Sequence, residues 1–257
     1  ASDGHIHAYQ ADGSEADGFP VKVDLRRPMK AGEPGNVRNS CAFRTDKSDC
    51  LRKNGSIDPE IAGQTAMMPA SIGDLDKDGT LEIVVTTWDG WVFVFEHDGT
   101  RRAGWPKSLV FDHVKDTDER NVVDGGFFAS PVLYDLDQQG GLEVIAAGQD
   151  QYLYAWHADG TPMAPYPVRV YNPEDEQSVN ERARIIATPA VGDIDGDGKP
   201  EIAAGTSEVY GAAGLENEAV CYVLDAETGT IADGWPQSIY GLTVSVLPVV
   251  GRGVGEG

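Results

Sequence analysis

The chain has 257 residues and a formal net charge of −22, because 42 acidic side chains stand against 20 basic ones. Such a surface repels nucleic-acid phosphates and anionic lipids, so we expect neither as a partner. Hydrophobic residues make up 40% of the chain, and no apolar run approaches the length of a membrane span. The composition therefore predicts a globular protein without membrane insertion.

Residues 1–25 are predicted to form two short strands joined by a tight turn. The run His5-Ile-His-Ala-Tyr precedes Asp12-Gly13, and Phe19-Pro20-Val-Lys follows. An Asp-Gly pair between two β-patterned runs is a hairpin signal. The same order, with a Thr-Gly turn in the last case, recurs over residues 91–108, 152–169 and 220–236.

A long polar connection, Arg26–Ala66, follows and carries Cys41 and Cys50. These two cysteines can close a small loop, and no C-x-x-C pair or Cys/His cluster suggests zinc. We predict a Cys41–Cys50 disulfide and an oxidising compartment, with two free thiols as the alternative. The third cysteine, Cys221, lies in an apolar strand pattern and is predicted to be a buried thiol.

Residues 66–126 contain the pattern around which the chain is organised, Asp74-Leu-Asp76-Lys-Asp78-Gly79-Thr-Leu-Glu82. Carboxylates at positions one, three and five of a short loop, with glycine at six, suit a hard cation with oxygen ligands, above all Ca²⁺. The acid at position nine and the strand pattern after it differ from an EF-hand, which needs a glutamate at position twelve and flanking helices. We therefore expect a calcium loop between two strands.

Residues 127–186 repeat this order with a weaker loop, Asp135-Leu-Asp137-Gln-Gln139-Gly140-Gly-Leu-Glu143. Gln139 replaces the third carboxylate, so this site is expected to bind Ca²⁺ less tightly. In the strand patterns over 91–95 and 152–156, aromatic residues alternate in the same phase with smaller apolar ones. Both faces are apolar, as expected for a sheet between two neighbouring sheets.

Residues 187–243 contain the most regular copy, Asp193-Ile-Asp195-Gly-Asp197-Gly198-Lys-Pro-Glu201. A fourth copy, Arg252–Gly257, keeps the glycines but has lost the first two acids, so no ion is expected there. The four copies begin about 60 residues apart. A repeat of this length with strand patterning predicts a propeller blade or a solenoid.

We predict an all-β fold, a β-propeller of four-stranded antiparallel blades. About four blades' worth of sequence is present, and because the chain opens and stops within a repeat we expect part of a larger propeller. The aromatic residues before proline are predicted to pack between blades, with a sugar-stacking platform as the alternative; they are Phe19, Trp105, Tyr166 and Trp235. The predicted segments are a partial blade with a long loop (1–65), three blades (66–126, 127–186 and 187–243) and the start of another (244–257).

The Asp-x-Asp-x-Asp-Gly-x-x-Glu loops, the Ser130-Pro131 and Thr188-Pro189 steps before them, and the Asp-Gly and Trp-Pro half of each repeat together resemble the FG-GAP/VCBS repeat family. This family includes calcium-binding blades of integrin α-subunit propellers and of many secreted proteins, so the resemblance implies seven or eight blades with Ca²⁺ in peripheral loops. The ligands it implies are the side chains of Asp74, Asp76, Asp78, Glu82, Asp193, Asp195, Asp197 and Glu201, the backbone carbonyls of Thr80 and Lys199, and, in the weaker loop, Asp135, Asp137, Gln139, Gly141 and Glu143.

The resemblance favours a secreted or cell-surface binding and adhesion module for a protein or glycan. Long connections on one rim, Arg26–Ala66 and Phe111–Gly126, are the expected ligand contacts, together with the charged connection Tyr171–Arg184; the alternative is that they only cover blade edges. No Ser/His/Asp or His/Cys pattern surrounds the five histidines, so we do not predict an enzyme. The alternatives are the propeller portion of a secreted peptidase or polysaccharide lyase, and a structural spacer.

Overall fold

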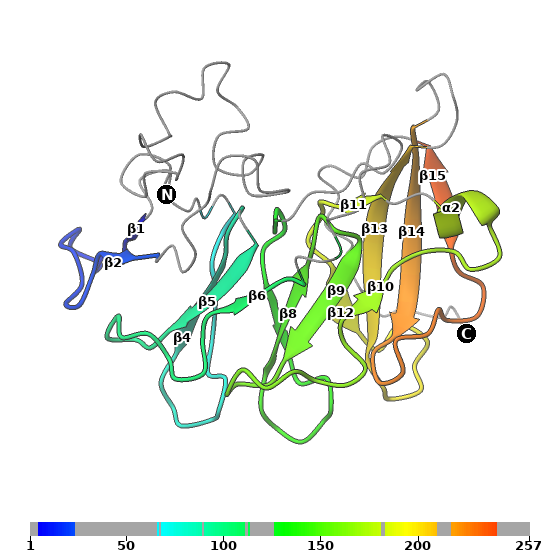
Figure 1. Ribbon diagram of the computed structural model, residues 1–257. Coiled ribbons are helices and arrows are strands. Elements are labelled where there is room, and N and C mark those ends of the chain that lie inside the picture. Colours follow the sequence, from blue (N-terminus) through cyan, green and yellow to red (C-terminus); the bar gives the residue numbers. More distant parts are fainter. Residues whose placement is uncertain are drawn as a thin grey trace, which may run out of the picture.

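The computed structural model describes residues 5–23, 66, 68–88, 90–110, 113, 126–180, 183–209 and 217–240. Nearly all of them form short antiparallel strands and the turns between strands, so the predicted all-β fold class is confirmed. Figure 1 shows successive sheets standing next to one another in chain order. Four-stranded sheets in this arrangement are the blades of a β-propeller. The number of blades in the complete propeller stays a prediction.

The strands fall into one pair and three blades. The N-terminal pair consists of β1 (His5–Ile6) and β2 (Val21–Lys22). The first blade consists of β3 (Ser71–Gly73), β4 (Glu82–Thr86), β5 (Trp91–Phe95) and β6 (Lys107–Ser108). The second consists of β7 (Val132–Tyr134), β8 (Glu143–Ala147), β9 (Tyr152–Trp156) and β10 (Val168–Arg169). The third consists of β12 (Ala190–Gly192), β13 (Glu201–Val209), β14 (Asn217–Asp225) and β15 (Gln237–Tyr240), with β11 (Arg184–Ile185) as a fifth strand paired with β13.

The alternation of side chains along each third strand decides which neighbour it packs against. In β5, Val92 and Val94 are completely buried and join a cluster with Trp156 of the second blade. The intervening Phe93 and Phe95 belong instead to the cluster shared with the N-terminal strand pair. The predicted alternation, with both faces buried, is therefore confirmed in this strand.

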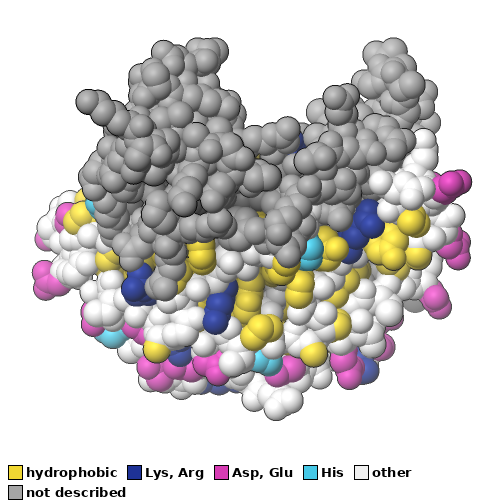
Figure 2. All heavy atoms as spheres, in the orientation of Figure 1, with side chains coloured by type: hydrophobic (Ala, Val, Ile, Leu, Met, Phe, Trp, Pro, Cys, Tyr) yellow, Lys and Arg dark blue, Asp and Glu magenta, His cyan; other side chains and the backbone are white. Residues whose placement is uncertain are grey.

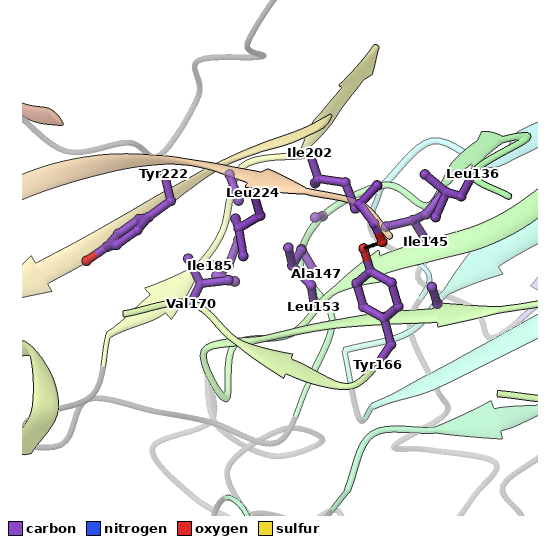
Figure 3. Packing of buried hydrophobic residues seen from close by; sticks show 14 of the residues in the cluster. Leu136, Ile145, Ala147, Leu153, Tyr166, Val170, Ile185, Ile202, Tyr222 and Leu224 are labelled. Carbon is purple, nitrogen blue, oxygen red and sulfur yellow. Dashed lines mark hydrogen bonds between the residues drawn. The ribbon is translucent and has the colours of Figure 1, made fainter. Parts of the chain in front are cut away.

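The second and third blades bury a larger cluster between them. Figure 3 shows Leu153 of the second blade close to Leu224 of the third, in a cluster that also includes Ile145, Ile202 and Tyr222. Burial of each such side chain contributes about 1.5–3 kcal/mol to folding. Contact between blades, rather than within one sheet, thus provides the hydrophobic core.

Two of the four aromatic residues before proline, Trp105 and Tyr166, join consecutive blades, as predicted. Trp105 is buried, its ring meets Trp156 edge-on with the centroids 5.9 Å apart, and its Nε1–H donates to the carbonyl oxygen of Ala158 at 3.0 Å. One blade further, the Tyr166 hydroxyl donates to the carbonyl oxygen of Ala226 at 2.9 Å. The described contacts of these two residues favour packing over a sugar platform.

Gly104, just before Trp105, permits a close approach between blades. Its φ is +85°, and a Cβ there would lie 2.1 Å from the carbonyl oxygen of Asp159 in the next hairpin. Only glycine meets both conditions without displacing that backbone. Gly104 therefore has a packing role at this junction between blades.

The charged connection over Tyr171–Arg184 contains the short helix α2 (Glu176–Asn180), which was not predicted. Ser178 in this helix is buried, and its Oγ accepts a hydrogen bond from the backbone N–H of Asn172 at 2.8 Å. This contact folds the connection back on itself. Among the described residues, no helix is long and apolar enough to cross a membrane.

The predictions for the cysteines are only partly tested. Cys221 in β14 is half-buried rather than fully buried, and burial raises the pKa of its thiol. Cys41 and Cys50 lie outside the described residues, as does the degenerate copy Arg252–Gly257.

Candidate metal centres

Three loops of equal length occupy corresponding places in the blades. The first loop (Asp74–Glu82) leads from β3 to β4, the second loop (Asp135–Glu143) from β7 to β8, and the third loop (Asp193–Glu201) from β12 to β13. They lie along the lower edge of the sheets in Figure 1. Acidic side chains gather along the same edge in Figure 2. The repeat thus places its acids on one rim.

Neighbouring loops are also joined to each other. The backbone N–H of Leu142 in the second loop donates to the carbonyl oxygen of Leu75 in the first at 2.9 Å. Gln138 Nε2 of the second loop donates to the carbonyl oxygen of Gly198 in the third at 2.5 Å. The loops therefore form a continuous band rather than three separate projections.

The aspartates of the first loop converge on one centre. Asp74, Asp76 and Asp78 each offer a carboxylate oxygen, and these oxygens lie within 4.8 Å of one another. Both oxygens of Asp74 accept backbone hydrogen bonds, from Asp78 N at 3.1 Å and Gly79 N at 3.0 Å. Gly79 has a φ of +91°, as expected for the residue that closes the turn.

Glu82, at position nine, is completely buried beneath this loop. Its Oε2 accepts a hydrogen bond from Leu75 N at 2.8 Å, whereas its Oε1 is buried without a hydrogen-bond partner. Burial raises the pKa of this carboxyl group. A buried carboxylate oxygen of this kind is costly unless a cation or donor satisfies it.

Arg102, which the sequence analysis did not include, reaches the first loop from the hairpin after β5. Its guanidinium donates to Asp76 and to Glu96, the latter at 3.3 Å, and its Nη1 lies 3.6 Å from Glu82 Oε1. The Arg102 side chain is only 13% exposed. The first loop therefore already contains a partly buried cation that pairs with two of its predicted calcium ligands.

In the third loop the acids are arranged in the same way, and among the described contacts none joins them to an arginine. Carboxylate oxygens of Asp193, Asp195 and Asp197 lie within 4.8 Å of one another. Glu201 Oε2 accepts a hydrogen bond from the backbone N–H that follows Asp193, at 2.6 Å, and burial raises the pKa of Glu201. Lys199 instead pairs with Glu227 on the next hairpin at 2.8 Å. The donor set of this loop consists of oxygens.

The second loop brings together a different set. Glu143 is buried, and its Oε2 accepts a hydrogen bond from Leu136 N at 2.8 Å, as its counterparts do. The ligand atoms within 4.8 Å of one another belong to Asp137, Glu143 and His157. Gln139 contributes a backbone N–H to Asp137 Oδ1 at 2.9 Å. His157 was not predicted as a ligand from the sequence. It lies in the hairpin after β9, and only the pairing of β8 with β9 brings it to the loop.

The remaining predicted ligands stand at position seven of their loops. Thr80 donates both its N–H and its hydroxyl to Asp78 Oδ1, at 2.7 and 2.6 Å. Lys199 donates its N–H to Asp197 Oδ1 at 2.7 Å. These bonds hold the position-five aspartates, and Gly141 occupies the same place in the second loop. Their roles as carbonyl ligands stay predictions.

The opposite edge of the second blade carries a buried polar cluster that the sequence did not suggest. Asp150 is completely buried, and it accepts a hydrogen bond from the Tyr154 hydroxyl and lies 3.1 Å from His113 Nδ1. Burial and the Asp150 carboxylate raise the pKa of Tyr154. In the third blade the equivalent Tyr222 donates to buried Glu208 at 2.5 Å. Because the arrangement repeats, we infer a structural role, in which a buried carboxylate accepts the hydrogen bond of a tyrosine hydroxyl inside the blade.

The third blade is matched by a known family. Residues 187–215 match the family model described as FG-GAP repeat. This segment is therefore similar to an FG-GAP repeat. It contains β12, the third loop and all of β13, so the family pattern falls on the most regular of the three loops.

Two solved structures are similar to a larger part of the chain, but at low sequence identity. The crystal structure of BamB from Moraxella catarrhalis is similar with a TM-score of 0.41 and 16% identity, covering 72% of this chain and 46% of that one. The structure of BBS1N in complex with ARL6DN, soaked with lead, is similar with a TM-score of 0.41 and 14% identity, covering 71% and 46%. The chain thus spans less than half of either structure. No curated protein matches it.

Proposed function

We propose that the chain is a calcium-binding β-propeller module, secreted or on the cell surface, that holds a protein or glycan partner. The observation that carries the calcium part is the buried Oε1 of Glu82, which lacks a hydrogen-bond partner next to three converging aspartates. The third loop supports it with four acids of the same arrangement. Calcium takes six to eight oxygen ligands in flexible shells, and such a donor set fits it.

The ion would act mainly on stability. Carboxylates that converge on one centre repel one another, and a bound divalent ion offsets part of that repulsion. Each loop also connects two strands of one blade, so the loop geometry affects strand pairing. An ion that binds only the folded chain adds to its stability by mass action.

The partner is proposed to bind at the edge opposite to the metal loops. Oxygens that surround an ion are directed inward and leave little chemistry for a ligand. The turns and connections at the other edge are carried by rigid blades, which is where binding residues are usually found. Among the described connections, the one after β10 also presents the acidic stretch Glu174–Glu176 and Val179, which is 40% exposed.

Thermal unfolding with and without a chelator tests the calcium proposal. We expect the melting temperature to fall clearly in excess EDTA, to recover with Ca²⁺, and to recover poorly with Mg²⁺, which prefers smaller octahedral shells. An unchanged melt in EDTA would contradict the proposal.

A glycan array probed with and without EDTA then tests sugar recognition separately. Deletion of residues 36–54, which lie outside the described structure, should reduce partner binding with little change in melting temperature.

A further inference from the structure

The second loop differs from the other two because a nitrogen atom joins its oxygen donors. His157 Nδ1 lies 3.2 Å from Glu143 Oε1 and 3.9 Å from Asp137 Oδ2. Glu143 is almost completely buried, whereas the His157 side chain is 38% exposed. The three side chains thus form a small polar cluster that is partly exposed to solvent at His157.

The separations suit a single ion with short bonds. Zinc and related ions bind imidazole nitrogen and carboxylate oxygen at about 2.0–2.2 Å, which places neighbouring donors about 3.0–3.5 Å apart in tetrahedral or octahedral shells. The 3.2 Å contact already falls in this range, and the 3.9 Å contact needs a shift of a few tenths of an ångström. Small side-chain rotations supply such a shift without movement of the backbone.

The donor types differ from those that calcium prefers. Calcium sites consist of oxygen ligands, whereas imidazole suits zinc, cobalt, nickel and copper. The positions equivalent to His157 are Glu96 in the first blade, which pairs with Arg102, and Asp225 in the third, which accepts a hydrogen bond from Thr228. Gln139 removes a carboxylate from the second loop, which further lowers its suitability for calcium.

A second, independent feature of this loop is an unsatisfied oxygen. Asp135 Oδ1 is buried and has no hydrogen-bond partner. Asp135 is the first residue of the loop, and a buried carboxylate oxygen without a donor is costly in the absence of a cation. The His157–Glu143 contact does not offset the cost of this buried oxygen, whereas a cation bound in the loop would.

We propose that Asp137, Glu143 and His157 form a binding site for a divalent transition-metal ion of the zinc and cobalt class, distinct in selectivity from the calcium loops. The ion would take the place of the hydrogen between His157 Nδ1 and Glu143, with the ring proton on Nε2. Its selectivity does not depend on whether the first and third loops bind calcium. The site would make one blade of the propeller respond to a different metal.

Titration of the chelator-treated full chain with Co²⁺ and Zn²⁺, in the presence of saturating Ca²⁺, tests this proposal. Co²⁺ is followed by its visible absorption and Zn²⁺ by calorimetry. We expect one equivalent of tight binding that excess Ca²⁺ does not displace. His157→Ala should weaken it at least about tenfold. The matched controls His97→Ala and His7→Ala change other hairpin or strand histidines and should leave it unchanged.

Two further variants keep the test decisive. Asp137→Asn should also weaken Co²⁺ binding, so that a folding failure of one variant does not hide the result. Gln139→Asp should shift the loop toward Ca²⁺, so that excess Ca²⁺ displaces Co²⁺ from this variant although it does not displace it from the wild type. Equal Co²⁺ affinity in wild type and His157→Ala, with circular dichroism showing that both are folded, would overturn the proposal and leave only an ion pair. Calcium-dependent melting measures the first and third loops separately.

Discussion

At each loop, one buried glutamate connects the start of a strand to the beginning of the loop before it. Glu82, Glu143 and Glu201 accept hydrogen bonds from the backbone N–H of Leu75, Leu136 and Ile194, at 2.6–2.8 Å. The side chain therefore has a structural role even without an ion. The second oxygen meets different groups in the first two blades, since Arg102 Nη1 lies 3.6 Å from Glu82 Oε1 and His157 Nδ1 lies 3.2 Å from Glu143 Oε1.

A single hydroxyl between blades offers a test at this scale. Tyr166→Phe removes the hydrogen bond to the carbonyl oxygen of Ala226 and leaves that buried acceptor without this donor. We expect a loss of about 1–3 kcal/mol in the free energy of unfolding, measured by urea denaturation. Tyr9→Phe, at a tyrosine that is 65% exposed, is the control and should change little. A neutral effect of Tyr166→Phe would show that the bond is not formed in solution.

The hairpin turns provide a pH test. Hydrogen bonds from the Thr161 hydroxyl and N–H hold the pKa of Asp159 below its usual value of 3.8. Because the pKa of Asp159 is lower in the folded than in the unfolded state, the ionised carboxylate stabilises the fold at pH values above the unfolded-state pKa. This contribution is lost as the pH falls through the folded-state pKa. Thr161→Ala should therefore lower the melting temperature slightly at pH 7. At about pH 2–3 the difference between variant and wild type should shrink. An equal difference at both pH values would contradict this explanation.

Among the elements, the loops share a sequence pattern but differ in the cations near them. Arg102 pairs with acids of the first loop, Lys199 turns away from the third toward Glu227, and His157 joins the second. Arg102 must be displaced or must rearrange before an ion occupies the first loop. The sequence predicts that the first and the third loop both bind calcium. The contacts of Arg102 with the first loop now favour tighter calcium binding by the third.

Arg102→Met tests whether the Arg102 guanidinium competes with calcium for the first loop. Methionine is chosen because Met163 occupies the equivalent position in the second blade. Without calcium, the variant leaves the acids around Glu82 unpaired and should lose about 3 kcal/mol of stability. With calcium, the first loop should bind more tightly, so the gap between melting temperatures in Ca²⁺ and in EDTA should widen. Arg101→Met, at the exposed neighbouring arginine, is the control. An unchanged gap would mean that Arg102 does not compete with the ion.

Across the whole molecule, stability depends on contact between sheets that are far apart in sequence. Leu153 and Ile145 of the second blade pack with Ile202 and Leu224 of the third, about 60 residues away on average. A single four-stranded sheet has two apolar faces and cannot bury either one alone. The blades therefore fold as a stack, in which each covers the next.

Leu153→Ala tests this dependence. The side chain is completely buried between blades, and its truncation should cost about 2–5 kcal/mol in the free energy of unfolding. Leu81→Ala, at a loop leucine that is 53% exposed, should have almost no effect. Chemical denaturation monitored by tryptophan fluorescence measures both variants. If the two losses were equal, the predicted core between blades would be wrong.

Local patterns were sufficient to predict the strands, the hairpins, the loops and the phase of burial. Asp-Gly turns, the alternation in residues 91–95 and the acid spacing in 193–201 act over a few residues, and each has a direct backbone or coordination reason. The repetition of these patterns was enough to predict a propeller, because a sheet that is apolar on both faces requires neighbours on both sides.

The tertiary structure alone decided which side chains meet at each loop. Arg102 and His157 lie 20 and 14 residues after Glu82 and Glu143, counting 102 − 82 and 157 − 143. Antiparallel pairing of the second and third strands brings the following hairpin back to the loop, and the twist and side-chain length then determine which residue reaches it. Such contacts depend on geometry between segments, so similar loop patterns acquire an arginine in one blade and a histidine in the next.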